Sequence, residues 1–112
     1  MIKSIENSEH YKWGKNCDGW HLLKTDTLSV IQEKMPSGTA EVLHYHGRSQ
    51  QLFFILSGSA KLEIDGMEYL VRTNESIHVK NRLKHKIQNA GDDDLHFLVI
   101  SEPHSHGDRI NC

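Results

Sequence analysis

The stretch GTAEVLHYHGRSQQLFFILSG, residues 38–58, contains two predicted strands separated by a turn. Residues 40–46 predict the first strand, and residues 51–57 predict the second, which is the most apolar strand of the chain. The segment between them holds glycine and polar residues, which are typical of turns. The antiparallel hairpin order of the predicted strands favours an all-β fold.

The rest of the chain repeats this pattern of short strands and turns. Asp65-Gly66 is a typical two-residue hairpin turn, because such turns need residues that accept a positive φ. Seven further strands are predicted at residues 19–24, 28–35, 60–64, 67–71, 76–80, 84–88 and 95–101. About nine short strands at regular spacing predict a sandwich or barrel, followed by a polar and partly irregular tail over residues 102–112.

Composition limits the classes of protein to which the chain can belong. Its 112 residues fit one domain, and a hydrophobic fraction of 37% suits strands that keep one face in water. The net charge of −2 argues against binding to nucleic acid. No apolar run is long enough for a membrane span, and the first residues do not begin a signal peptide. We therefore expect a soluble, cytoplasmic protein, in which Cys17 and Cys112 suit free thiols.

Histidine is over-represented, with nine in the chain, and two of them lie two residues apart on a predicted strand. His44 and His46 should point to the same face, close enough to share a metal ion. Chance alone gives roughly 0.7 such pairs in a chain of this composition, so the pair is weak evidence by itself. A second pair, His104 and His106, lies in the tail, where no predicted strand organises it.

The surroundings of the first pair resemble the first signature of the cupin family, G-x5-H-x-H-x4-E-x6-G. Every spacing matches, because Gly38, His44, His46 and Gly58 stand at the glycine and histidine positions. One letter departs from the signature: Gln51 occupies the position of the family's glutamate. This signature is the strongest functional signal in the chain.

The second cupin signature, G-x5-P-x-G-x2-H-x3-N, is degenerate in this sequence. Its last two positions are present as His85 and Asn89. Its first glycine, its proline and its second glycine are replaced by Asn74, Lys80 and Arg82. On one signature with a single departure and one further ligand position, the chain is identified as a small single-domain member of the RmlC-like cupin superfamily.

The resemblance implies a cupin-type β-barrel, in which two facing antiparallel sheets form a jelly roll, also called a double-stranded β-helix. The single domain would span residues 1–112, with the barrel core at about 19–101. In metal-binding cupins, two histidines and the glutamate of the first signature and the histidine of the second hold one ion. Carried over to this chain, the metal ligands are His44, His46, Gln51 and His85.

Three imidazole nitrogens and one oxygen suit a divalent transition metal, and zinc, iron, nickel, manganese and copper all remain open. A glutamine ligand brings no charge, so the ion would keep its full charge and attract an anionic ligand. Arg48 and Lys84 flank the predicted ligands and are expected to steer such an anion. Two alternatives stay open: three histidines hold the ion without Gln51, or the site is empty.

Strand alternation also predicts which side chains line the interior. Phe53 and Ile55 share the face of Gln51 and are pocket candidates. His96 is a third candidate, because it lies on the same face of its strand as the apolar residues Leu98 and Ile100. His78, in contrast, should face outward.

Phe54 and Leu56 lie on the opposite face of the most apolar strand. An apolar outer face in so small a protein favours a homodimer, and the resemblance points the same way.

No catalytic residue can be named from the sequence. The chain lacks a nucleophile elbow, a glycine-rich phosphate loop and a paired carboxylate at a readable spacing, and few acidic residues can be placed inside the barrel. The leading interpretation is a metal-dependent enzyme that acts on a small oxygen-rich or anionic metabolite, of dioxygenase, lyase or sugar-phosphate-isomerase-like type. The alternative is a non-catalytic, metal-containing protein that binds or senses a small molecule.

Overall fold

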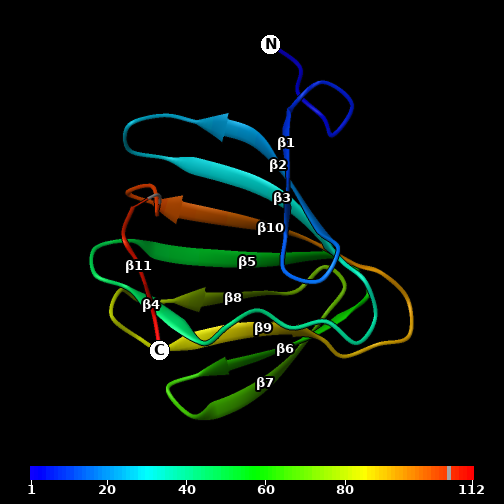
Figure 1. Cartoon of the computed structure of the whole chain (residues 1–112), viewed down its shortest axis with the longest axis vertical. Helices are drawn as coiled ribbons and strands as arrows, with labels where there is room; N and C mark the ends of the chain where they lie inside the picture. The colour runs from blue at the N-terminus through cyan, green and yellow to red at the C-terminus, as the bar shows by residue number, and fades with distance from the viewer. Residues whose placement is uncertain (106) are drawn as a thin grey trace.

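The computed structural model describes residues 1–105 and 107–112, and these residues form eleven strands and no helix (Figure 1). The strands are β1 Glu9–Trp13, β2 Cys17–Lys24, β3 Ser29–Met35, β4 His44–His46, β5 Gln50–Ser57, β6 Ser59–Ile64, β7 Met67–Arg72, β8 Ser76–Val79, β9 His85–Asn89, β10 Leu95–Glu102 and β11 Arg109–Asn111. One member of the second histidine pair, His106, lies outside the described residues. Within the described ranges there is no helix with the length and apolar character needed to cross a membrane.

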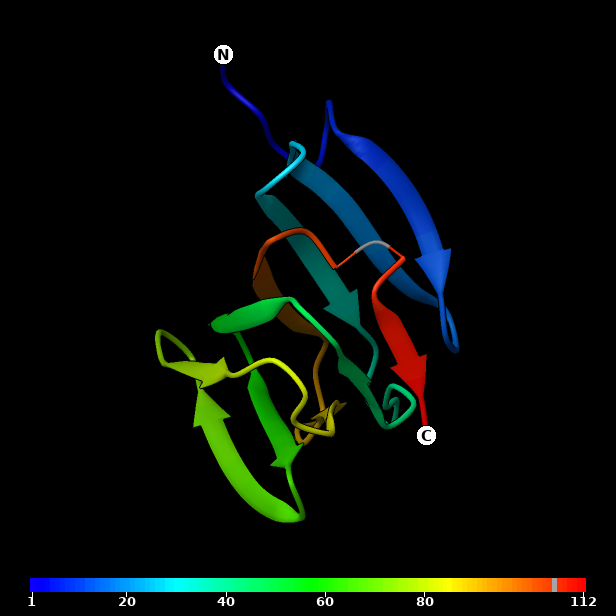
Figure 2. The same cartoon turned by 90° about the vertical axis from the view of Figure 1, so that its left-hand side faces the viewer.

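The strands form two antiparallel sheets, as predicted. The six-stranded sheet has the order β1-β2-β3-β10-β5-β8, and the five-stranded sheet has the order β11-β4-β9-β6-β7. In Figure 1 the strands β2, β3, β10 and β5 run across the molecule one below another, and Figure 2 shows the barrel from its side. Several neighbours are distant in sequence, such as β3 and β10 in one sheet and β4 and β9 in the other, which is typical of a jelly roll. The predicted cupin-type β-barrel is confirmed.

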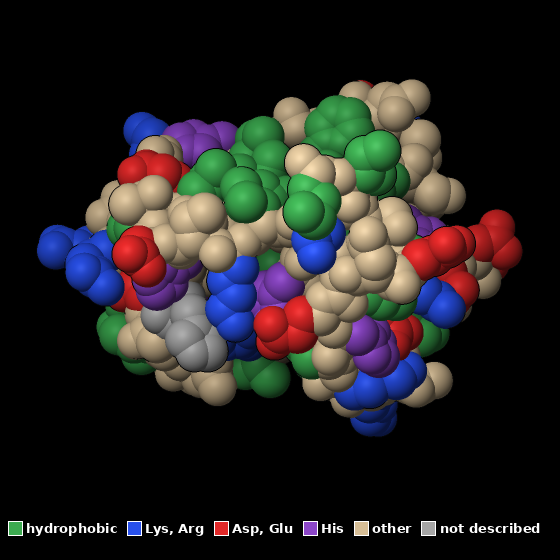
Figure 3. All heavy atoms as spheres, turned by 90° about the horizontal axis from the view of Figure 1, so that it is seen from above, with side chains coloured by type: hydrophobic (Ala, Val, Ile, Leu, Met, Phe, Trp, Pro, Cys, Tyr) green, Lys and Arg blue, Asp and Glu red, His purple; other side chains and the backbone are tan. Residues whose placement is uncertain are grey.

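Alternation along the strands places the core between the sheets. In β5, Phe53 and Ile55 are buried, whereas Phe54 and Leu56 lie half-buried on the outer face, as predicted. Phe97 of β10 is fully buried, and its ring centroid lies 6.0 Å from that of Phe53. On the face shown in Figure 3, acidic and basic side chains are interspersed.

The predicted hairpin turn joins β6 and β7. Ile64 pairs with Met67, so the loop contains only Asp65 and Gly66, with φ angles of 52° and 86°. This conformation explains why the sequence places aspartate and glycine there.

Two edge strands are not predicted by the sequence pattern. The strand β1 reads EHYKW and has mostly exposed side chains, so it shows no apolar alternation. The strand β11 has only three residues and pairs with β4, which carries two of the predicted metal ligands. The tail therefore contributes a strand beside the candidate site.

The residues at the two glycine positions of the second signature adopt the backbone conformation that glycine favours. Asn74 and Arg82 have φ angles of 69° and 71°, in the left-handed region that glycine adopts most readily. Asparagine tolerates this region better than most residues do. At Arg82 the peptide N–H donates a hydrogen bond to the carbonyl oxygen of His46 at 2.7 Å. The turn before β9 thus keeps its shape and is tied to the strand of the first two histidines.

Candidate metal centre

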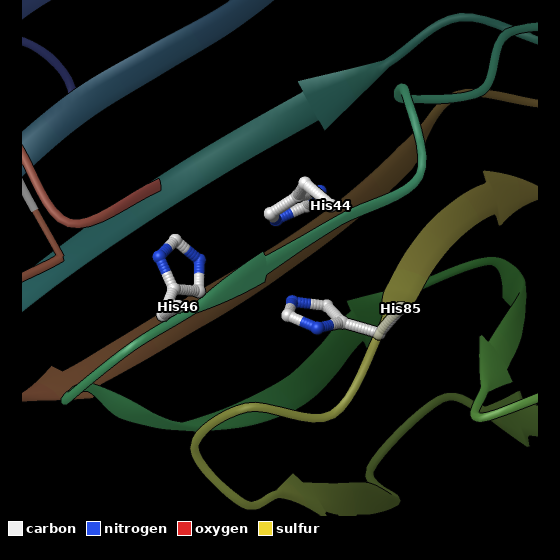
Figure 4. Close-up of side chains that lie close together, drawn as sticks. All are labelled: His44, His46 and His85. Atoms are coloured by element: carbon white, nitrogen blue, oxygen red, sulfur yellow. The ribbon is translucent and has the colours of Figure 1, made fainter. Parts of the chain in front are cut away.

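Three histidines converge between β4 and β9 (Figure 4). His44 and His46 project from the same face of β4, and His85 begins β9 directly opposite His44. One ring nitrogen from each histidine lies within 4.8 Å of the others, and all three side chains are buried. The structure therefore brings together the three histidines that the sequence predicts as ligands.

Backbone carbonyls orient two of the rings. The Nδ1 atoms of His44 and His85 lie 2.8 Å and 2.9 Å from the carbonyl oxygens of Val42 and Leu83. An Nδ1–H that donates to a carbonyl leaves Nε2 with a free lone pair, which is the usual arrangement of a metal-binding histidine.

The third ring, His46, has no such partner. Both of its nitrogens are buried and make no hydrogen bond within the described part of the chain. A buried polar atom without a partner costs free energy, and a bound cation would satisfy it. The donor set therefore fits a metal ion.

Burial also keeps the three imidazoles neutral. Desolvation lowers the pKa of His44 to about 3 and that of His46 to about 4, and it lowers the pKa of His85 as well. The neighbouring positive charge of Arg109 lowers all three further. The rings are unprotonated at neutral pH, which is the form that binds a metal.

Gln51 of β5 lies beside these rings and is 6% exposed. Its Oε1 lies 3.0 Å from Nε2 of His85, and its Nε2 donates to Oγ of Ser101 at 2.9 Å. Two atoms that bind one ion at adjacent positions, each at about 2.1 Å, are roughly 3 Å apart. The position of the amide oxygen is therefore compatible with a fourth ligand.

Replacing Gln51 by glutamate is expected to tighten zinc binding by at least about tenfold, because a carboxylate is a charged and stronger ligand than an amide. The Ser101 hydroxyl can donate to the new carboxylate, so the local hydrogen bond survives. Calorimetric titration with zinc measures the change. Gln50→Glu is the matched control, since its exposed side chain lies one residue away on the same strand. Equal affinity of Gln51→Glu and the unmodified protein would show that residue 51 does not contact the ion.

A cavity of about 770 Å³ opens beside His44 and His46. Of the predicted pocket residues, Phe53 lines its wall, whereas Ile55 is a fully buried core residue that does not reach it. The prediction for His96 is wrong, because that side chain lies on the outer face of β10. Both faces of β10 carry apolar residues, so the pattern alone does not reveal which face is inside. The inward residues are Leu95, Phe97, Val99 and Ser101.

The cavity wall contains charged residues that the sequence does not predict. Glu33 from β3, Glu41 from the segment before β4 and Arg109 from β11 all line it. Strand alternation in the sequence did not place these two glutamates inside the barrel. Arg48 and Lys84, which were expected to steer an anion, are exposed and lie outside the cavity wall.

The two glutamates have different partners. The Tyr11 hydroxyl donates a hydrogen bond to Oε2 of Glu33 at 3.2 Å. Glu41 accepts a hydrogen bond from the peptide N–H of Ile87 at 3.0 Å, and its Oε2 lies 4.0 Å from a guanidinium nitrogen of Arg109. Burial raises the pKa of Glu33 to about 8 and that of Glu41 to about 7. Two half-buried carboxyl groups thus share the cavity with the candidate metal centre.

Comparison with known proteins agrees with this fold. The family model described as "Cupin domain" matches residues 31–101. An uncharacterised protein of Methanocaldococcus jannaschii is 31% identical over 89 residues, which are 79% of this chain and 71% of the relative. The oxalate-binding protein of Thermotoga maritima is 27% identical over 85 residues, which cover 71% of this chain and 70% of that protein.

Solved structures show the same architecture. An RmlC-like cupin from Shewanella frigidimarina superposes with a TM-score of 0.85 at 16% identity, over 95% of this chain and 93% of that one. At this identity the likeness concerns the fold alone. Together with the family model and the archaeal relative, it leads to one conclusion: this chain is a member of the cupin family.

Proposed function

We propose that the chain binds one divalent transition-metal ion on His44, His46 and His85, with Gln51 as a fourth ligand. We further propose that the protein is an enzyme, and that its ion binds a small, oxygen-rich anionic metabolite as the substrate. The observation that carries the proposal is the convergence of three buried, neutral imidazoles beside a cavity of about 770 Å³. When bound, the ion would polarise the oxygen atoms of the metabolite.

Three features support an anionic ligand. All four proposed metal ligands are neutral, so the charge of the ion is not offset by the groups that hold it. Arg109 adds a positive charge to the cavity wall. The relative from Thermotoga maritima is named an oxalate-binding protein, so a small dicarboxylate is the first compound to test.

Two measurements test this function. Elemental analysis of freshly purified protein should find about one transition-metal ion per chain. Calorimetry should then show that the zinc-loaded protein binds oxalate more tightly than a neutral sugar or an amine, and that the metal-free protein does not bind it. Absence of metal together with no binding on titration would overturn the proposed site. Equal binding of neutral and anionic compounds would overturn the proposed ligand class.

A non-catalytic binding protein is the second candidate, because the Thermotoga maritima relative is named for binding rather than for turnover. The two candidates differ in the fate of the ligand. Recovery of oxalate and related acids unchanged after long incubation with protein loaded with manganese, iron or zinc would favour the binding protein. Conversion of any of them would favour the enzyme.

We also infer that the protein forms a homodimer through the outer face of the six-stranded sheet. On this face Leu98 lies beside Phe54, and Ile100 lies beside Leu52, all of them half-buried. Light scattering at micromolar concentration should therefore report twice the mass of one chain, and Phe54→Lys should shift the protein toward the monomer. A monomeric mass for the unmodified protein would contradict the inference.

A further inference from the structure

A row of three residues crosses β1, β2 and β3 on the inward side of the sheet. Tyr11 pairs with Gly19, and Gly19 pairs with Glu33. Gly19 has no side chain, and a Cβ atom there would overlap the ring of Tyr11. The phenol therefore lies over Gly19 and reaches the carboxyl group of Glu33 on the next strand but one.

Glu33 faces the same cavity as His44 and His46. Its Oε2 accepts the hydrogen bond of Tyr11, whereas its Oε1 makes no hydrogen bond among the residues that the structure describes. One oxygen of this carboxyl group is thus held in place, and the other is available to a molecule in the cavity.

The surroundings divide the two cavity carboxyl groups into one anion and one acid. Two carboxylates that share a low-dielectric site repel each other, so the group with the better cationic partner ionises first. Glu41 has the guanidinium of Arg109 and a peptide N–H, whereas Glu33 has only a phenol. Burial and the charge of Glu41 raise the pKa of Glu33 in agreement with this division. The titratable and charged groups that act on Glu33 or line the cavity with it are Tyr11, Cys17, His21, Lys24, Asp26, Glu41, His44, His46, His104 and Arg109.

We propose that Glu33, positioned by Tyr11 across Gly19, is a ligand-binding carboxylic acid whose Oε1–H donates a hydrogen bond to an anionic oxygen of the metal-held molecule. This inference rests on the proposed function and narrows its substrate class. The molecule carries one oxygen that binds the ion and a second anionic oxygen directed toward β3, as a dicarboxylate does. When Glu33 ionises, its hydrogen-bond donor is lost, and the resulting carboxylate repels the same anionic ligand.

The test is a titration of zinc-loaded protein with oxalate between pH 6 and pH 9, followed by calorimetry. Oxalate remains a dianion throughout this range, so a change in affinity reflects the protein. Above the pKa of Glu33 the affinity should fall about tenfold for each pH unit, because one proton must be taken up for the ligand to bind.

Three variants identify the group responsible. Glu33→Gln keeps a neutral hydrogen-bond donor at this position, so its oxalate affinity should lack the tenfold fall per pH unit above about pH 8. The weaker change expected near pH 7, where Glu41 titrates in the same cavity, should remain. Tyr11→Phe should move the fall to higher pH, because the Tyr11 hydrogen bond favours the ionised form of Glu33. Glu63→Gln, the same change on β6 and outside the cavity wall, should behave like the unmodified protein.

The outcomes separate this inference from the function on which it rests. If Glu33→Gln binds zinc normally and keeps the fall in oxalate affinity, another group titrates, such as water on the ion, and the inference is overturned. If oxalate binds the unmodified protein equally well without zinc, or does not bind at any pH, the proposed function itself is overturned, and the inference about Glu33 falls with it. Loss of the fall above about pH 8 in Glu33→Gln, together with a displaced fall in Tyr11→Phe, supports the inference, since a purely structural role would not move the pH profile.

Discussion

The His46→Ala variant is expected to lose at least about 100-fold in zinc affinity while the metal-free barrel stays as stable as before. Loss of a group that merely supports a metal ligand costs about 10- to 100-fold, so loss of a ligand should cost more. Stability should change by less than about 1 kcal/mol, because His46 makes no hydrogen bond within the described residues and its removal leaves no partner unsatisfied. Zinc titration and urea unfolding of metal-free protein measure the two effects.

The matched control for this variant is His78→Ala. His78 is an exposed histidine on β8, where its Nε2 lies 2.9 Å from Oε1 of Gln50, and its replacement should leave zinc affinity unchanged. If His46→Ala binds zinc normally, the three-histidine site is wrong. If the circular dichroism spectrum shows an unfolded protein instead, His46 has a structural role.

The Phe97→Ala variant is expected to lower the free energy of unfolding by about 3–5 kcal/mol, through lost burial and the cavity left behind. Phe97 is fully buried between the sheets, and its ring packs near that of Phe53. Phe53 in turn lies with its ring centroid 6.1 Å from that of His85, so this part of the core also supports the candidate metal centre. Urea unfolding of metal-free protein gives the free energy directly.

Leu98→Ala is the control for Phe97→Ala, because Leu98 is the next residue of β10 and lies half-buried on the outer face. Its replacement should cost clearly less in the isolated chain. Similar losses in the two variants at a concentration that favours the monomer would contradict the assignment of inner and outer faces on this strand.

The parts of the fold that were predictable are those in which a short sequence pattern has one structural solution. Asp65 and Gly66 form their hairpin turn because both accept a positive φ. His44 and His46 share a face because strand geometry requires it, and His85 joins them through the register between β4 and β9. These relations depend on local geometry, and the family resemblance supplied the long-range pairing.

The second wall of the cavity was not predictable by the same reasoning. Glu33 lies in the polar run Gln32-Glu33-Lys34, where nothing marks the inward residue. Its partner Tyr11 belongs to an edge strand with no apolar alternation, and Arg109 belongs to a strand of three residues in a polar tail. Arg109 reaches the cavity because β11 pairs with the distant strand β4. The row of Tyr11, Gly19 and Glu33 across β1, β2 and β3 is visible only once the register of these strands is known.

The left-handed conformations of Asn74 and Arg82 bear on how this family diverges. At these positions the fold selects a pair of dihedral angles, and glycine is one of several residues that can supply them when neighbouring hydrogen bonds help. The glycine positions of the second signature therefore correspond to a backbone conformation, whereas its histidine position corresponds to a side chain that faces the candidate metal centre. A residue other than glycine can stand at the first kind of position while the barrel is kept, as Asn74 and Arg82 do here. A chain can thus lack both signature glycines and still present a histidine at the start of β9.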